Sequence, residues 1–275
     1  MEKHYLGYSE QDLKQSPYAT YYNPNLNPMQ QQVMEALSIG GQAEELFPPV
    51  GEASRMQESG YWPVESGFTR AADASIRVFC LTHMPDVSPH MWDWWFGWHG
   101  CEAQRYKLWH PKAHIDARWA DGDSDERYLG RTSLIKEYVG SKLIRGGISF
   151  IPPTEMGFDE IKLNNQGEVA VCARIGVPGT PVSGGWLCHQ VRPVAGGSEM
   201  RSRMWLGGDN GALGSNPGLI SKGLIRLLRP VIHQLLPDPA DLLVHNSQEM
   251  SHLASFLPKL YAEFGSTGTS RGKVE

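Results

Sequence analysis

The chain has 275 residues and a mass of 30.6 kDa, enough for one large domain or one domain with an appended subdomain. Its formal net charge is -5 and its pI is about 6.1, and no block of Lys and Arg is dense enough to neutralise a row of phosphates, so nucleic acid is not an expected partner. The amino terminus has no apolar signal core, and no stretch approaches about eighteen consecutive apolar residues. We therefore expect a soluble cytoplasmic protein that does not enter a membrane.

The first part of the chain differs in composition from the rest. Residues 1–72 are rich in Asn, Gln, Pro and Tyr, and their clearest periodic stretch, 29–43, predicts one helix. We interpret 1–72 as an N-terminal arm or small subdomain, 73–265 as the main catalytic domain, and 266–275 as a disordered tail.

Short apolar runs begin after residue 74, and turn residues separate them. Five of these runs have the length of strands: 75–81, 147–151, 169–175, 186–192 and 198–206. Helical patterns are predicted at 93–107, 133–140, 219–236 and 238–264; Pro230 should break or kink the third, and Pro258 should kink or end the fourth. Strands followed by a long terminal helix predict an α+β fold in which a curved antiparallel sheet grips that helix.

The terminal helix contains the first candidate for chemistry. His245 and Glu249 are four residues apart, so on a helix both side chains point the same way and can share one metal ion. The alternative interpretation is a surface His–Glu pair, which would stabilise the helix by a few tenths of a kcal/mol.

Three other polar positions stand out against apolar surroundings. His110 and His114 flank Pro111, and a turn stiffened by proline can hold a histidine towards a cavity. Glu137 interrupts an apolar face of the predicted helix 133–140, where its carboxylate is either solvated at the helix edge or recruited inward. His189 lies on a predicted strand, and its alternative role is that of a hydrogen-bonded core histidine.

Nine tryptophans are unusual for this length, and four of them fall between residues 92 and 98. Trp94, Trp95 and Trp98 could form a flat apolar wall for an aromatic or polyketide substrate, or could simply fill the core. The four cysteines are scattered without a CxxC pair, which indicates small buried hydrophobic residues and no disulfide scaffold.

Several motifs in a fixed order carry a family resemblance. They are the run WWFGWH, the segment RYKLWHPKAH, the carboxylate before YVG, the strand CHQVRP and the terminal HxxxE helix. Between Ser75 and Phe264 the chain resembles the diacetylphloroglucinol hydrolase and phloretin hydrolase family, which cleaves carbon–carbon bonds with zinc. The resemblance implies a helix-grip, Bet v 1-like catalytic domain preceded by a smaller region used in forming a homodimer.

The resemblance also implies the composition of the site. One Zn²⁺ per chain would be held by His114, Glu137, His245 and Glu249, with His110 as the alternative to His114; a loop shortened over 121–127 would account for the short interval before Glu137. His189 would lie near the substrate and Tyr106 would bind a phenolic oxygen. Two polar contacts of the family are replaced, an asparagine by Ala117 and a tyrosine by Met204.

These expectations define a function and two rivals. The favoured function is zinc-dependent hydrolysis of an acyl carbon–carbon bond in an acylated phenol or a related β-diketone polyketide. In this reaction zinc would polarise the ketone and His189 would transfer a proton. Tyr106 would orient a ring hydroxyl, and Glu137 would act as ligand, as base, or as both in turn. The loss of two polar contacts predicts a substrate other than diacetylphloroglucinol. The rivals are a non-hydrolytic cyclase or isomerase of a polyketide or terpenoid pathway and a small-molecule carrier.

Overall fold

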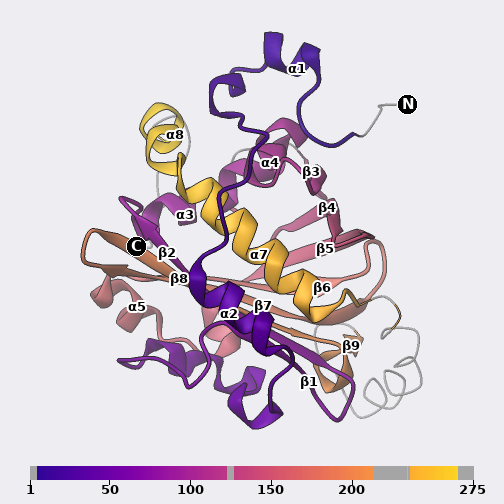
Figure 1. Cartoon of the computed structure of the whole chain (residues 1–275), viewed down its shortest axis with the longest axis vertical. Coiled ribbons are helices and arrows are strands. Elements are labelled where there is room, and N and C mark those ends of the chain that lie inside the picture. The colour runs from indigo at the N-terminus through magenta and orange to yellow at the C-terminus, as the bar shows by residue number, and fades with distance from the viewer. Residues whose placement is uncertain (1–4, 123–126, 214–233, 235, 266–275) are drawn as a thin grey trace.

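The computed structural model describes residues 5–122, 127–213, 234 and 236–265. Its centre is a nine-stranded antiparallel sheet (Figure 1). The strands are β1 (Gly67–Arg70), β2 (Ile76–Pro85), β3 (His114–Trp119), β4 (Thr132–Val139), β5 (Lys142–Ile151), β6 (Val169–Gly176), β7 (Val182–Val194), β8 (Gly197–Leu206) and β9 (Ala212–Leu213). All five strands predicted from apolar runs are confirmed, within β2, β5, β6, β7 and β8.

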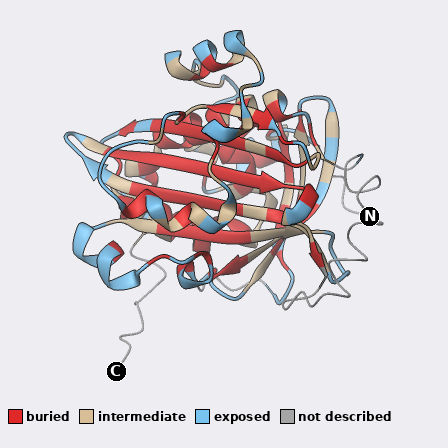
Figure 2. Cartoon of the chain, turned by 90° about the horizontal axis from the view of Figure 1, so that it is seen from below, coloured by how far each residue is buried: buried red, intermediate tan, exposed pale blue. Residues whose placement is uncertain are grey.

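Neighbouring strands follow the order β1-β2-β8-β7-β6-β5-β4-β3, and β9 pairs with β7. Because β8 is covered on both faces, nine of its ten residues are buried. Figure 2 shows the strands of the sheet largely in the colour of buried residues. Strand alternation then divides the apolar residues between two cores. In β2, Val78 and Cys80 join the larger core, whereas Phe79 joins the smaller core on the opposite face.

The larger core lies under the long helix α7 (Pro239–Ala254), which crosses one face of the sheet and contacts β2 more than any other element (Figure 1). The predicted α+β helix-grip arrangement is therefore confirmed. The predicted helix 238–264 is divided, because the chain turns at Ser255 and Phe256 and continues as α8 (Leu257–Phe264), where Pro258 occupies the first turn. Proline is tolerated there because the N–H groups of the first helical turn make no hydrogen bond within the helix, so the N–H that proline lacks removes none.

Two helix predictions need correction. Residues 133–140 form the strand β4 and not a helix, because they pair with β3 on one side and β5 on the other. The predicted helix 93–107 consists of α3 (Pro89–Trp98) and α4 (Ala103–Trp109), separated by the 3₁₀ turn His99–Cys101. Gly100 allows this turn, since a Cβ atom there would lie 2.6 Å from the indole ring of Trp119.

Residues before β1 cover both sides of the sheet. The helix α2 (Gln31–Ile39) confirms the helix predicted within 29–43 and contacts α7, while α1 (Glu10–Gln15) and the 3₁₀ helix Ala19–Tyr21 precede it. Further 3₁₀ helices, Glu44–Leu46 and Val50–Gln57, lie on the smaller core with a third, Pro153–Met156, and with α5 (Glu160–Gln166). On that face Glu65 forms ion pairs with the buried Arg201 and Arg203.

The remaining predictions fall at the edge of what the structure covers. The helix predicted at 219–236 lies almost wholly outside the described residues, and so does the tail predicted at 266–275. A final 3₁₀ helix, Gly208–Asn210, precedes β9.

Within the described ranges, no helix combines the length and the apolar character needed to cross a bilayer. The four cysteines are free thiols, and three of them are buried.

Candidate metal centre

The helix α7 supplies an imidazole and a carboxylate to the buried site. His245 and Glu249 lie one turn apart, their side chains are buried, and Nε2 of His245 is 3.7 Å from Oε2 of Glu249. Asp238 caps the helix by accepting from the amides of Ala240 and Asp241. The i, i+4 spacing thus aims both side chains inward, as predicted.

A glycine lets the start of α7 approach the sheet. Gly140, in the turn between β4 and β5, has a φ of +59°, and a Cβ atom there would lie 2.0 Å from Oδ2 of Asp241. Any other residue would combine a left-handed backbone with a collision. The turn therefore fixes how closely the helix meets the end of β4.

The other two candidate ligands come from paired strands. His114 begins β3 directly opposite Glu137 in β4, so the sheet register places the two side chains together. Nε2 of His114 is 3.4 Å from Oε2 of Glu137, and the imidazole is fully buried. Glu137 is thus recruited inward, but from a strand and not from the helix edge that the sequence suggested.

All four predicted ligands converge on one point. Besides the distances above, Nε2 of His114 lies 3.4 Å from Oε2 of Glu249, and Nε2 of His245 lies 3.9 Å from Oε2 of Glu137. A tetrahedral ion bound at about 2.1 Å separates its ligands by about 3.4 Å, and the four imidazole-to-carboxylate distances, 3.4 to 3.9 Å, are close to that value. His114, His245 and Glu249 form a group whose ligand atoms lie within 4.8 Å of one another and could hold a metal ion. Glu137 lies beside this group, with Oε2 within 3.9 Å of both imidazoles.

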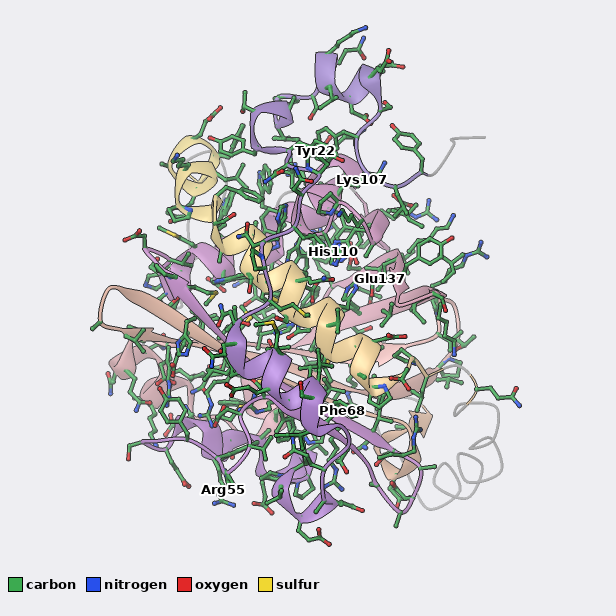
Figure 3. All side chains as sticks on the ribbon, viewed as in Figure 1. Tyr22, Arg55, Phe68, Lys107, His110 and Glu137 are labelled. Carbon is green, nitrogen blue, oxygen red and sulfur yellow. The ribbon has the colours of Figure 1, made fainter. Side chains whose placement is uncertain are left out.

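His110, the alternative ligand, occupies a different position. It ends α4, and its ring stacks on that of His245 with centroids 5.0 Å apart. Figure 3 shows His110 and Glu137 beside α7, contributed by α4 and β4. His114 is the histidine that faces both carboxylates, whereas His110 lies behind His245.

Tyr106 in α4 determines which ring nitrogen of His114 carries the proton. Its backbone carbonyl accepts a hydrogen bond from Nδ1–H of His114 at 2.9 Å, which leaves Nε2 as the unprotonated nitrogen that faces the carboxylates. Nε2 is buried and has no hydrogen-bond partner in the described part of the chain. A buried lone pair directed at two carboxylates is unfavourable by itself, so a cation among the four side chains suits this arrangement.

Hydrogen bonds from neighbouring side chains hold the two candidate carboxylate ligands in place. The hydroxyl of Tyr106 donates to Oε2 of Glu137, and Nδ2 of the fully buried Asn246 donates to Oε1 of Glu249 at 3.1 Å. Sequence reasoning did not identify Asn246. Asn246 precedes Glu249 by three residues on the same helix, and residues at that spacing are neighbours. This spacing could have identified it from the sequence.

Burial changes the acidity of these groups. Burial raises the pKa of Glu249 to about 8, with His245 opposing and Glu137 reinforcing the effect. Burial lowers the pKa of His114 to about 4, so its imidazole is neutral near pH 7. Burial, with the Glu137 charge beside it, raises the pKa of Tyr106 well above 10. His114 therefore offers a neutral imidazole, the form that binds metals.

Three further predicted positions lie on strands of the sheet. His189 in β7 is buried; its Nδ1 lies 2.8 Å from Oγ of Ser202 and its ring stacks on Phe96, 5.6 Å away. Burial lowers its pKa to about 3. Ala117 in β3 and Met204 in β8 are both buried. Among the described residues, Ser202 and Phe96 of the core are the contacts of His189 named above, and neither is a candidate ligand.

The tryptophans of α3 are largely committed to packing. Trp94 stacks on Trp98, and the two contact Tyr261 and Phe264 of α8. Trp95 stacks on His99, 5.4 Å away, and contacts Trp109, whose ring lies edge-on to His114 at 5.5 Å. Of the three, Trp95 is thus separated from the site by one aromatic ring, whereas Trp94 and Trp98 face the terminal helix.

Comparison with known proteins identifies the family of this chain. Residues 46–262 match the family described as DAPG hydrolase PhiG domain. The chain is 30% identical over 270 residues to a 2,4-diacetylphloroglucinol hydrolase of Pseudomonas sp, covering 92% of this chain and 90% of that protein. It is also 30% identical over 271 residues to the phloretin hydrolase of Eubacterium ramulus, covering 94% and 93%.

Among solved structures, the ginseng major latex-like protein 151 of Panax ginseng aligns with a TM-score of 0.39 at 9% identity, covering 66% of this chain and 96% of that protein. Ara h 8.0201 aligns with a TM-score of 0.36 at 10% identity, covering 67% and 99%. The sequence match is the decisive one, because it spans most of the chain and includes all four converging residues. The chain belongs to the DAPG hydrolase PhiG domain family.

Proposed function

We propose that this protein is a zinc-dependent hydrolase that cleaves an acyl carbon–carbon bond in an acylated phenol or a related β-diketone polyketide. The observation that carries the proposal is the convergence of His114, Glu137, His245 and Glu249, with Nε2 of His114 left unpartnered. The family supports it, since both relatives named above are hydrolases and one is named for diacetylphloroglucinol.

The four side chains would hold one Zn²⁺ per chain. Zinc, when bound, polarises an acyl carbonyl and acidifies water at neutral pH. Two imidazoles and two carboxylates suit zinc, which takes nitrogen and oxygen ligands in tetrahedral geometry. The hydrogen bonds from Tyr106 and Asn246 keep the carboxylates oriented for that geometry.

The protein's own residues would then manage the protons. Oε2 of Glu137 accepts a proton from the attacking water as oxygen adds to the acyl carbon. The bond between the acyl carbon and the ring carbon breaks, and its electron pair stays on the ring carbon, where neighbouring hydroxyls delocalise the charge. The proton taken up by Glu137 passes by way of His189 to that carbon, so both side chains end in their starting state. The hydroxyl oxygen of Tyr106, whose own proton is donated to Glu137, accepts a hydrogen bond from a ring hydroxyl. The products are a carboxylic acid and the deacylated phenol.

The substrate we propose is not diacetylphloroglucinol. The family resemblance implies that Ala117 and Met204 replace an asparagine and a tyrosine, and both residues are buried and apolar. A site that lacks two hydrogen-bonding groups leaves ring hydroxyls without partners, which disfavours a heavily hydroxylated ring. We propose an acylated phenol with fewer free hydroxyls, bound against Trp95 and its neighbours.

Incubation with a panel of acylphenols tests this function. Purified protein should contain about one zinc per chain and should release a carboxylic acid from at least one acylphenol, and a chelator should abolish the release. Metal-loaded protein that converts a panel member without releasing acid would indicate the cyclase or isomerase. Protein that binds acylphenols without metal and changes none of them would be a carrier. Either result would refute the hydrolase.

We also propose that residues 1–72 form a distinct N-terminal subdomain that takes part in a cytoplasmic homodimer. Support comes from the composition of this segment and from the position of its helices α1 and α2 outside the sheet (Figure 1). Light scattering on the full chain should give twice the monomer mass, and a chain that stays monomeric at micromolar concentration would overturn the dimer.

A further inference from the structure

A groove of about 470 Å³ opens beside α7. One wall is the extended segment 25–29, and the opposite wall is the first half of α7. Its floor comes from the turn that joins α4 to β3 and from the end of β4. The lining residues are Asn25, Leu26, Asn27, Pro28, Met29, His110, Lys112, Ala113, Tyr138, Gly140, Asp241, Val244, His245 and Gln248.

This groove reaches the candidate metal centre. His245 lines it and also belongs to the group whose ligand atoms lie within 4.8 Å of one another. His110 lines it as well and stacks on His245 at 5.0 Å. The groove and the metal group are therefore joined through these two imidazoles.

His110 borders the groove and holds a buried polar atom without a partner. Only 3% of the residue is exposed, its side chain is hydrogen-bonded to Gln248, and Nδ1 has no hydrogen-bond partner among the described residues. A buried nitrogen without a partner costs about 1–3 kcal/mol unless a ligand or water satisfies it. A phenolic hydroxyl that reaches Nδ1 from the groove would satisfy it, and the side-chain amide of Asn25 also lines the groove.

The outer wall is held by side chains. Nδ2 of Asn27 donates to the carbonyl of Ser251 in α7 at 3.1 Å, and Gln30 exchanges two hydrogen bonds with the backbone of His83 in β2. In the part of the chain that the structure describes, the backbone of residues 23–29 makes no hydrogen bond to other backbone. Segments held by few contacts open at low free-energy cost, so this wall can move without disturbing the sheet.

We propose that this groove is the route by which phenolic substrates reach the metal group, that segment 25–29 sets the size of substrate admitted, and that His110 is a substrate-positioning residue. The inference rests on the proposed function for the nature of the substrate. It assigns to the N-terminal segment a part in substrate selection that is separate from dimer formation.

Two variants of the wall act in opposite directions. Leu26→Trp fills the groove, so it should lower kcat/KM at least tenfold and slow the rate at which a chelator removes the metal from the holoprotein by a similar factor. Asn27→Ala releases the wall from α7, so it should accelerate metal removal severalfold. The matched control is Leu13→Trp, because Leu13 lies on α1 and is 49% exposed. Both rates should stay within twofold of the wild type in that control.

Binding of 2′-hydroxyacetophenone, an acylphenol with one ring hydroxyl, to metal-free protein tests the role of His110 without turnover when it is measured by calorimetry. Leu26→Trp and His110→Ala should each weaken binding at least tenfold while melting temperature stays within a few degrees, and His110→Gln, which keeps a polar atom, should restore part of the affinity. Unchanged binding and unchanged metal removal in Leu26→Trp would overturn the groove proposal even if the wild type hydrolyses acylphenols. Conversely, wild-type protein that binds this acylphenol in the groove but releases no acid from any acylphenol would refute only the hydrolase.

Discussion

The phenol ring of Tyr106 lies parallel to the imidazole of His114, with centroids 3.8 Å apart and planes 3° apart. The backbone carbonyl of the same tyrosine accepts from Nδ1–H of His114, and its hydroxyl donates to Glu137. One residue of α4 thereby orients two candidate ligands that come from two different strands. The stacked ring fixes the plane of the imidazole, and the carbonyl fixes which nitrogen carries the proton.

Tyr106→Phe separates these contributions. The variant keeps the ring and the carbonyl, so metal content should remain near the wild-type value, whereas loss of the hydroxyl should lower kcat by about 10²-fold or more, as expected for a group that orients a reacting atom. Elemental analysis and steady-state kinetics measure the two effects. A variant that loses its metal would show that the hydroxyl acts mainly through Glu137.

His245→Ala should remove most of the bound metal. The imidazole is one of four converging donors, and the remaining three cannot complete a tetrahedron without recruiting solvent. We expect affinity to fall by about 10²-fold or more, measured by competition with a chromogenic chelator. His83→Ala is the control, since the His83 side chain is 54% exposed. Full metal content in His245→Ala would contradict the ligand assignment.

Asn246→Ala tests the support of Glu249. The amide of Asn246 donates to Oε1 of Glu249, and loss of such a contact typically costs about 10–100-fold in metal affinity. Ser247→Ala removes a buried hydroxyl from the next position of α7 and should leave affinity within threefold. If the two variants bind metal equally well, the hydrogen bond from Asn246 has no role in coordination.

Metal binding at pH 7 should release about one proton from Glu249. Burial raises the pKa of this carboxyl to about 8 in the metal-free protein, so it is mostly protonated at pH 7 and must ionise to bind a cation. Calorimetry in buffers of different ionisation enthalpy counts the protons. The contribution of Glu249 should disappear as the pH rises past about 9. A proton count that does not change between pH 6.5 and pH 9 would argue against the raised pKa.

His252→Leu should protect the protein against acid. The imidazole is buried on α7, neither ring nitrogen has a partner among the described residues, and burial lowers its pKa from 6.5 to about 4. As the pH falls, His252 is protonated in the unfolded chain before it is protonated in the folded protein. The free energy of unfolding therefore decreases between about pH 6.5 and about pH 4. Leucine should add about 1 kcal/mol at pH 7 and more at pH 4.5, measured by chemical denaturation. An equal gain from His83→Leu would show that the effect is not due to burial.

Local sequence determined the relation between His245 and Glu249. Residues four apart on an α-helix share a face whatever surrounds them, so the pair could be identified before its partners were known. Apolar runs bounded by turn residues likewise predicted the central strands, because β-strands that are covered on both faces read as continuous apolar segments. The motif order, which indicated the family, predicted the other two ligands without showing how they meet.

Tertiary structure decided the remainder. The run from Ser133 to Val139 is short and apolar, and periodicity does not distinguish a buried strand from a helix at that length. Pairing with β3 and β5 made it a strand, and the register then set Glu137 opposite His114. The docking of α7 at Gly140 brought His245 and Glu249 to the same point. A sequence fixes which donors exist, but long-range strand pairing and helix packing fix the distances between them, and a metal responds to those distances.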